Sequence, residues 1–261
     1  MQEKSPLARA LDVVRDLRRR CPWDRAQTRE TLRPYLVEEV FELDHALSEG
    51  KPDAIREEVA DLLLHLAWQF VLAEERREFT PEDVAADLEQ KMRRRHPQLY
   101  DLGPPERWEN LKRKERTRGV LDGLPPGLPD ILLAYRLQER AATVGFDWPN
   151  AAGPLAKVRE ELGEVERQLT EDAADDPDVH SARAEEIGDL LFAVINLARK
   201  VGVQPGLALD RANRKFRDRI AAIERLALER RIDIQSAGLA ALDSLWEEVK
   251  AHGRSSAETG A

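Results

Sequence analysis

The sequence predicts an all-α protein made of two similar helical bundles in tandem, and three observations support this prediction. Ala, Leu, Glu and Arg dominate the 261 residues, and alternating runs of β-branched residues are nearly absent. Helix start signals recur, such as the N-cap, first-turn proline and acids of Thr80-Pro81-Glu82-Asp83. Motifs of the first half also return, in order, in the second half. The length suits two modest domains.

The expected helices follow from these start signals and from the distribution of apolar residues. Pro52, Pro154 and Pro205 are interpreted as first-turn prolines, because a proline there removes no helical hydrogen bond. We expect helices over residues 7–20, 32–48, 52–77, 81–95, 105–116, 130–143, 154–170, 181–201, 205–230 and 238–252.

Helix-breaking residues divide the chain into two parts. Residues 119–129 read GVLDGLPPGLP, and this run of glycine and proline predicts a linker. The N-terminal domain is therefore expected at residues 1–118 and the C-terminal domain at residues 130–252. We expect the acidic stretch 172–178 to be a solvated loop and the tail 253–261 to be disordered.

Five segments of the first half match segments of the second half in the same order. Shared heptad-like patterns between unrelated helices are the alternative explanation, but they do not account for five ordered matches. A duplicated domain with altered loop lengths is the better explanation. The matched pairs are 22–24 with 146–148, 38–42 with 160–164, 57–63 with 185–191, Lys91 and Arg95 with Lys215 and Arg219, and 108–112 with 246–250.

Acidic residues in the first half are spaced to share helix faces. Glu39 and Glu42 lie three residues apart, as do Glu58 and Asp61 on the next expected helix. From residue 59 to residue 73 the only polar residues are Asp61, His65 and Gln69, and they lie on one narrow stripe. This helix is therefore expected to be buried except for an acidic slot.

The second half repeats the arrangement with Glu161, Glu164, Glu186 and Asp189. Four convergent carboxylates would repel one another strongly without a compensating charge. Carboxylate oxygens are the ligands that Mg²⁺ and Mn²⁺ prefer. An isolated ExxE pair is usually a solvated helix face, but two pairs on successive helices, both duplicated, predict a metal site in each half.

Basic residues recur at matched positions as well. Lys91 and Arg95 lie one helical turn apart, and so do Lys215 and Arg219. A lysine and an arginine on one face can clamp phosphate groups. An ordinary basic helix surface is the alternative interpretation, and these residues alone do not decide between the two.

Composition excludes several classes of protein. Cys21 is the one cysteine, which rules out a disulfide framework or a cysteine-based zinc site and favours a reducing, cytoplasmic setting. We expect no membrane helix, because no segment is apolar enough, and no signal peptide, because the first residues lack its apolar core. The net charge of −9 disfavours nucleic-acid binding. No glycine-rich P-loop is present, which argues against a kinase or P-loop ATPase.

Together these motifs resemble those of the all-α nucleoside triphosphate pyrophosphohydrolases, which carry paired ExxE and ExxD motifs followed by a lysine-bearing helix. Residues 21–28 (CPWDRAQT) are similar to the MazG branch, as are residues 95–97, 144–148 and 188–192. The resemblance covers residues 5–250. It implies two MazG-like domains, a homodimer, and hydrolysis of nucleoside triphosphates or their deoxy forms to monophosphate and pyrophosphate with Mg²⁺, or Mn²⁺ in its place.

The resemblance also assigns site residues. Metal ligands fall on Glu161, Glu164, Glu186 and Asp189, with counterparts Glu39, Glu42, Glu58 and Asp61. Beyond the resemblance, we expect catalytic roles for Lys215 and Arg219, which would hold the phosphates, and for Glu160 or Glu185, which each lie beside a proposed ligand and are both open as the base that takes a proton from water. Nucleotide contacts fall on Lys157, Val158, Arg159, Glu160, Glu161, Ala182, Arg183, Ala184, Glu185, Asp189, Lys215, Phe216, Arg217, Asp218, Arg219 and Trp246.

The two halves are not equivalent. Tyr35 stands where the C-terminal half has Lys157, and Glu89 stands where it has Asn213. The N-terminal half thus loses a cation and gains an acid where phosphates are expected. We therefore expect the C-terminal half to be the main catalyst, in an enzyme of nucleotide-pool house-cleaning or regulation. The alternatives are a non-catalytic nucleotide- or metal-binding regulator, a helical module for protein partners, or a relative with a different nucleotide substrate.

Overall fold

The computed structural model of the chain describes residues 4–105, 119–169 and 177–258. Every regular element within these ranges is a helix, so the predicted all-α class is confirmed. The chain separates into two compact units, Met1–Glu106 and Arg107–Ala261. No helix in the described ranges is long and apolar enough to cross a membrane.

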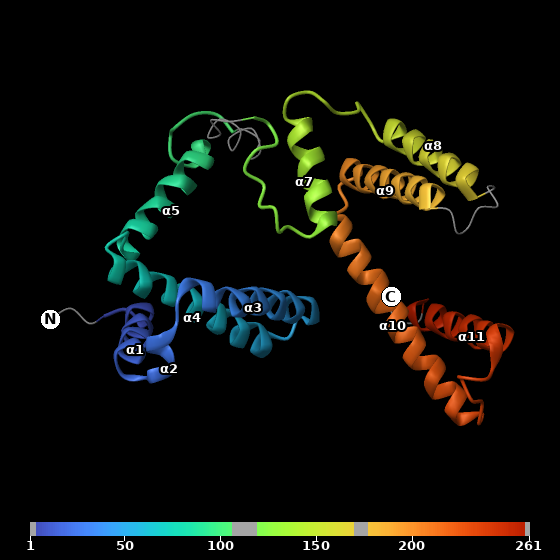
Figure 1. The fold of residues 1–261 in the computed structure, drawn as a ribbon, viewed down its shortest axis with the longest axis horizontal. Coiled ribbons are helices and arrows are strands. Elements are labelled where there is room, and N and C mark those ends of the chain that lie inside the picture. The colour runs from blue at the N-terminus through green and yellow to red at the C-terminus, as the bar shows by residue number, and fades with distance from the viewer. Residues whose placement is uncertain (1–3, 106–118, 170–176, 259–261) are drawn as a thin grey trace. The chain divides into compact units, whose positions relative to one another are not determined.

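The N-terminal unit is built on a helical hairpin, α3 and α4, which pack along each other (Figure 1). α1 covers the second half of α4, and together they bury a core that includes Val14, Leu32 and Trp68. The left-handed φ of 70° at Gly50 ends α3 and starts the hairpin turn. The elements are α1 (Pro6–Arg20), α2 (Pro22–Ala26), α3 (Arg29–Glu49), α4 (Pro52–Arg76), α5 (Pro81–Arg95) and the 3₁₀ helix η1 (Pro97–Leu99).

The C-terminal unit repeats the hairpin with α8 and α9, which pack along each other, and α7 lies against α9 (Figure 1). α10 touches α7 and α9 at its start and pairs with α11 over its second half, around Ile223, Ala227 and Leu245. The elements are α7 (Asp130–Ala142), α8 (Ala152–Leu169), α9 (Pro177–Lys200), α10 (Pro205–Glu229) and α11 (Gly238–Glu258).

Most predicted helices are confirmed, with shifted ends. α3 begins at Arg29 because Thr28 and Thr31 form a reciprocal capping box, with N–H to Oγ1 distances of 2.8 and 3.2 Å. α9 begins at Pro177, so the last two residues of the expected loop 172–178 belong to a helix. α11 continues to Glu258, beyond the predicted end at residue 252. The predicted helix 105–116, with the repeat segment 108–112, lies outside the described residues except at residue 105.

The expectation that the helices carrying the acidic motifs are largely buried is wrong for the single chain. On α4, Val59, Leu64 and Leu66 are exposed, and on α9 the same holds for Ile187 and Leu191. Neighbouring apolar side chains on α3 and α8 are exposed as well, among them Phe41 and Leu162. The apolar periodicity predicted burial, but helices of the same unit do not cover these side chains.

Ion pairs hold the loop after α7, which contains Asp147, against the C-terminal end of α9. Asp147 accepts hydrogen bonds from Arg199 and from Lys200, the latter at an Nζ–Oδ2 distance of 2.9 Å. Burial alone would raise the pKa of Asp147, but these hydrogen bonds outweigh it and lower the pKa to about 2.

We expect Asp147→Asn to destabilise the C-terminal unit by about 1–2 kcal/mol at neutral pH, because the folded form holds the ionised carboxylate. The contribution is complete above pH 4 and is lost as the pH falls through about 2, so the difference between variant and wild type shrinks with acidification. Urea unfolding at several pH values measures it. Equal destabilisation at pH 7 and pH 2 would contradict the ion-pair explanation.

Candidate metal centre

Three carboxylates converge in the C-terminal unit at the packing seam of α8 and α9. Glu161 comes from α8, and Glu186 and Asp189 come from α9; their ligand oxygens all lie within 4.8 Å of one another. Glu186 and Asp189 share a face because they are three residues apart on one helix. The i, i+3 spacing in the sequence therefore predicted that these two acids lie together, while their role as metal ligands stays a prediction.

Glu161 is the buried member of the C-terminal cluster, with 3% of its surface exposed. Its Oε1 atom accepts an ion-paired hydrogen bond from Lys157 Nζ at 2.6 Å, but its Oε2 atom is buried and has no hydrogen-bond partner. A buried carboxylate oxygen without a partner is costly unless something positive binds it. This orphan oxygen, facing two further carboxylates, fits a hard cation.

Lys157 carries a positive charge at the edge of this cluster. Its Nζ atom also lies 2.9 Å from Glu160 Oε1, and the hydrogen bonds that it donates to Glu161 and, to a lesser extent, to Glu160 raise the pKa of the amine. The ammonium group is therefore charged at neutral pH. It stands one helical turn before Glu161 and is paired with both Glu160 and Glu161.

Glu164 is not one of the three residues whose ligand atoms converge, although the sequence placed it among the ligands. The neighbouring Glu161 carboxyl group raises the pKa of Glu164, and burial and the charge of Glu186 act in the same direction. A 3.1 Å ion pair with Arg167 holds the carboxylate on the outer side. Glu164 thus neighbours the cluster without completing it.

The N-terminal unit repeats the cluster with Glu39 on α3 and Glu58 and Asp61 on α4, whose ligand oxygens also lie within 4.8 Å of one another. Glu39 Oε2 is again buried without a partner, as at the matched position Glu161. Burial, and then the charges of neighbouring acids, raises the pKa of Glu39 and of Glu58. Carboxylates that resist ionisation for these reasons are those that a bound cation would stabilise.

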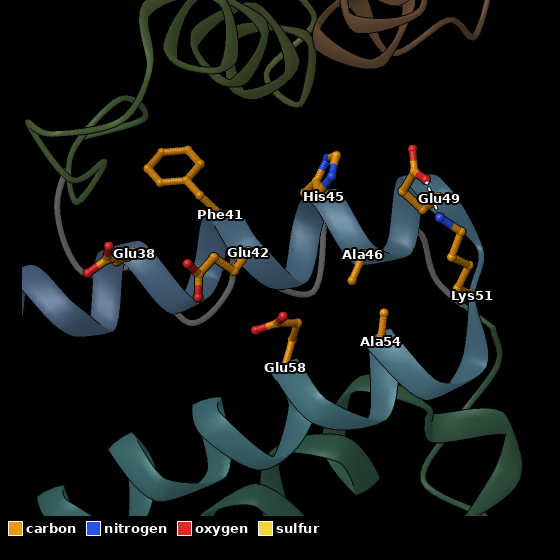
Figure 2. Close-up of a pocket in the computed structure, with 9 residues that line it drawn as sticks. All are labelled: Glu38, Phe41, Glu42, His45, Ala46, Glu49, Lys51, Ala54 and Glu58. Atoms are coloured by element: carbon orange, nitrogen blue, oxygen red, sulfur yellow. Dashed lines mark hydrogen bonds and ion pairs between the residues drawn. The ribbon is translucent and has the colours of Figure 1, made fainter.

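Glu42 lies just outside the N-terminal cluster, like Glu164 in the other half. It lines a cavity of about 600 Å³ between α3 and α4, together with Glu38, Glu49 and Glu58. In Figure 2, Glu42 and Glu58 extend from facing helices into the same space. The cavity is acidic, and Lys51 at its end is paired with Glu49 at 3.0 Å.

His65 was noticed in the sequence as a polar residue of the α4 stripe, but no role was assigned to it. It is 6% exposed, and its Nε2 atom lies 3.9 Å from Glu39 Oε1. Burial lowers its pKa, against the opposing effect of Asp61, so the imidazole is neutral at neutral pH. The repeat places Ala193 at this position in the C-terminal half, so a histidine borders only the N-terminal cluster.

The basic residues of α10 form a group of their own. The guanidinium of Arg219 lies 5.3 Å from the centroid of the Trp246 ring, and Phe216 lies 5.6 Å from the same ring. Lys215 is on the same helix, and within the described residues no contact joins it or Arg219 to the acid cluster. The predicted phosphate clamp of Lys215 and Arg219 stays a prediction.

The remaining predicted residues lie on the helices that form these groups. Val158 and Arg159 accompany Lys157 on α8, while Arg217 and Asp218 accompany Lys215 on α10. The approach to the second acidic motif lies on α9, where Arg183 donates to the Gln168 carbonyl at 3.1 Å. This approach consists of Ala182, Arg183, Ala184 and Glu185.

Comparison with known proteins identifies similarity over most of the chain. Residues 27–100 match the family model of the MazG nucleotide pyrophosphohydrolase domain. The chain is 34% identical to the nucleoside triphosphate pyrophosphohydrolase of Escherichia coli K12, over 96% of this chain and 98% of that one. It is 38% identical to the nucleoside triphosphate pyrophosphohydrolase/pyrophosphatase MazG of Thermotoga maritima, over 88% and 89%. A nucleoside triphosphate pyrophosphohydrolase of Mycobacterium tuberculosis is 35% identical over 56% of this chain and 47% of that one.

Proposed function

The chain belongs to the MazG family, and from that premise we propose that it hydrolyses nucleoside triphosphates to nucleoside monophosphate and pyrophosphate. The observation that carries the proposal is the pair of orphan oxygens, Glu161 Oε2 and Glu39 Oε2, buried at matched positions inside acid clusters. A triphosphate is itself polyanionic, so such clusters can approach it only with a cation between them. We propose two MazG-like domains, at residues 1–118 and 130–252.

We propose Mg²⁺, with Mn²⁺ able to replace it, as the cation held by Glu161, Glu186 and Asp189 and by their counterparts. The all-oxygen donor set supports this choice, since these two ions prefer carboxylate oxygens. When bound, the cation would neutralise phosphate charge and lower the pKa of bound water. Glu164 and Glu42, which border the clusters, serve as further ligands or as acceptors of hydrogen bonds from bound water.

The other side chains position the triphosphate and receive a proton. Lys157 supplies a fixed charge beside Glu161, where it binds a phosphate oxygen. Glu160 and Glu185 each neighbour a proposed ligand, and either accepts the proton of the attacking water. Lys215, Arg219 and Trp246, on α10 and α11, are proposed to contact the nucleotide.

The direct test is product analysis on the eight common ribo- and deoxyribonucleoside triphosphates with Mg²⁺. We expect equimolar monophosphate and pyrophosphate, with bond cleavage between the α- and β-phosphates. Release of inorganic phosphate and a diphosphate, or no turnover of any of the eight, would contradict the proposed reaction. The second outcome would favour the alternative of a non-catalytic nucleotide-binding regulator.

We further propose that the protein is a homodimer. Apolar side chains on both metal-bearing hairpins are exposed in the single chain, including Phe41, Leu66, Leu162 and Leu191. Burying such faces is the main driving force of permanent association.

Light scattering at micromolar concentration is expected to give twice the chain mass of 29.7 kDa. Leu66→Glu should weaken the dimer, because it places a charge on the apolar face, whereas Leu121→Glu in the connecting segment serves as a matched control. A wild-type mass of one chain would contradict the dimer.

A further inference from the structure

A cavity of about 600 Å³ in the C-terminal unit is not used by the proposed metal chemistry. It lies between α7, α9 and the loop that follows α7, and its apolar walls include Leu137, Phe146, Trp148 and Phe192. The indole ring of Trp148 packs directly over Gly153, where a Cβ atom would come within 2.3 Å of the ring. The absence of a side chain at Gly153 therefore makes room for Trp148. The ion pairs of Asp147 with Arg199 and Lys200 hold the same loop against α9.

Two amide side chains give this cavity a defined hydrogen-bonding character. Gln138 is 7% exposed, and its Nε2 atom donates to the Phe192 carbonyl at 2.8 Å, which fixes the orientation of the amide. Its Oε1 atom is buried and has no hydrogen-bond partner. Asn196 Oδ1 accepts from Arg199 Nη2 at 2.8 Å, so its amide nitrogen is the group left to donate. The cavity thus offers one unused acceptor and one donor.

The position of the cavity relative to the acid cluster is set by α9. Asn196 follows Asp189 by seven residues, which is close to two helical turns, so both lie on nearly the same face. At about 1.5 Å of rise per residue, the separation along the axis is about 10 Å. An extended nucleotide whose phosphates lie at the acid cluster can place its base at this distance.

The N-terminal half lacks these features at the matched positions. The offset that aligns Asp61 with Asp189 aligns Trp68 with Asn196, and Trp68 is only 2% exposed, within the hydrophobic core. The guanidinium of Arg18 lies 5.9 Å from the centroid of the Trp68 ring. When Asp24 is aligned with Asp147, the residue that matches Arg18 in the C-terminal half is Ala141. An indole and an arginine therefore stand where the C-terminal half has an amide and a methyl group.

We propose that this cavity is the nucleobase subsite of the C-terminal half, an inference that rests on the proposed function. Phe146 and Trp148 present aromatic surface against which a base can stack. Gln138 Oε1 accepts from an N–H group of the base, and Asn196 donates to a ring nitrogen or carbonyl oxygen. The N-terminal half, with Trp68 in place of the amide, binds the triphosphate with little contribution from the base.

Binding measurements can test the subsite separately from turnover. The protein carries Asp61→Ala to silence the N-terminal site, and calorimetry with Mg²⁺ compares a non-hydrolysable nucleoside triphosphate analogue with inorganic triphosphate, which has no base. We expect Gln138→Leu and Asn196→Trp each to weaken analogue binding about tenfold or more, because a buried hydrogen bond or the cavity itself is lost. Binding of inorganic triphosphate should change less than twofold.

The melting temperature of Gln138→Leu checks for misfolding: the variant loses the hydrogen bond to the Phe192 carbonyl but also removes a buried acceptor without a partner, and because these effects oppose each other we expect little change. Unchanged analogue affinity in both variants would overturn the subsite, as would equal weakening of the analogue and of inorganic triphosphate. Failure of the proposed function appears separately, as tight analogue binding by the wild-type chain without cleavage of any triphosphate.

Discussion

Chelation of divalent metal is expected to abolish triphosphate cleavage completely, and Mg²⁺ titrated into the chelated protein should restore it. The reason is electrostatic: in each half three carboxylates have ligand oxygens within 4.8 Å of one another, and one oxygen is buried without a partner. Without a cation these groups repel both one another and the substrate. Pyrophosphate release measured against free Mg²⁺ gives the dependence directly, and full activity in excess EDTA would refute it.

A matched pair of variants on α8 separates metal binding from general charge effects. Glu161→Gln keeps the size of the buried side chain but removes the anionic ligand, so the rise in melting temperature on adding Mg²⁺ should shrink sharply. Glu166→Gln removes the same charge from an exposed position of the helix, away from the cluster, and should keep the wild-type response. Equal responses in the two variants would show that Mg²⁺ does not bind at Glu161.

The acid clusters could be predicted from sequence because helical geometry fixes which residues share a face. Spacing alone placed Glu58 with Asp61 and Glu186 with Asp189, and the duplication paired each with one acid of the preceding helix. Spacing did not reveal that Glu161 is buried while Glu164 is turned toward Arg167, because that depends on how α8 rotates against α9. The three-residue clusters are therefore smaller than the four-residue sets expected.

The sequence also could not predict which helix packs against the basic face of α10, because this too depends on tertiary packing. A pattern of charges one turn apart shows that Lys215 and Arg219 share a face, but it does not show which helix that face meets. In the structure, Arg219 packs on the Trp246 ring of α11. Likewise, the alignment of the two halves matches Trp68 with Asn196. Only the packing shows that Trp68 lies in the hydrophobic core and that Asn196 lines a cavity.

The short helix α2 and the fastened loop after α7 show a second limit. Both halves carry an aromatic–Asp entrance, Trp23-Asp24 and Phe146-Asp147, yet the first forms a helical turn and the second an irregular loop. Gly145, with φ of 88°, and the pairing of Asp147 with Arg199 account for the difference. The conformation of such segments depends on contacts with residues distant in sequence, and hydrophobic periodicity does not predict those contacts.

The two halves are expected to contribute unequally to turnover. Both keep their clustered acids, but the C-terminal cluster has Lys157 at 2.6 Å from Glu161. Tyr35 stands at the matched position in the other half, where its ring lies against Trp23 at a centroid distance of 6.5 Å. A missing phosphate contact in a desolvated site costs about 2–4 kcal/mol of transition-state stabilisation, or roughly 30- to 1,000-fold in rate.

Glu186→Ala or Asp189→Ala should therefore remove most turnover, whereas Glu58→Ala or Asp61→Ala should leave more than half of it. The comparison uses all eight ribo- and deoxyribonucleoside triphosphates, because the Tyr35 hydroxyl can still donate to a phosphate and preserve weak N-terminal activity on some of them. Lys157→Ala should lower the activity of the C-terminal half to that of the N-terminal half, as measured with Asp61→Ala as background. Equal losses from either half on every substrate would mean that the two sites are coupled and that Lys157 does not distinguish them.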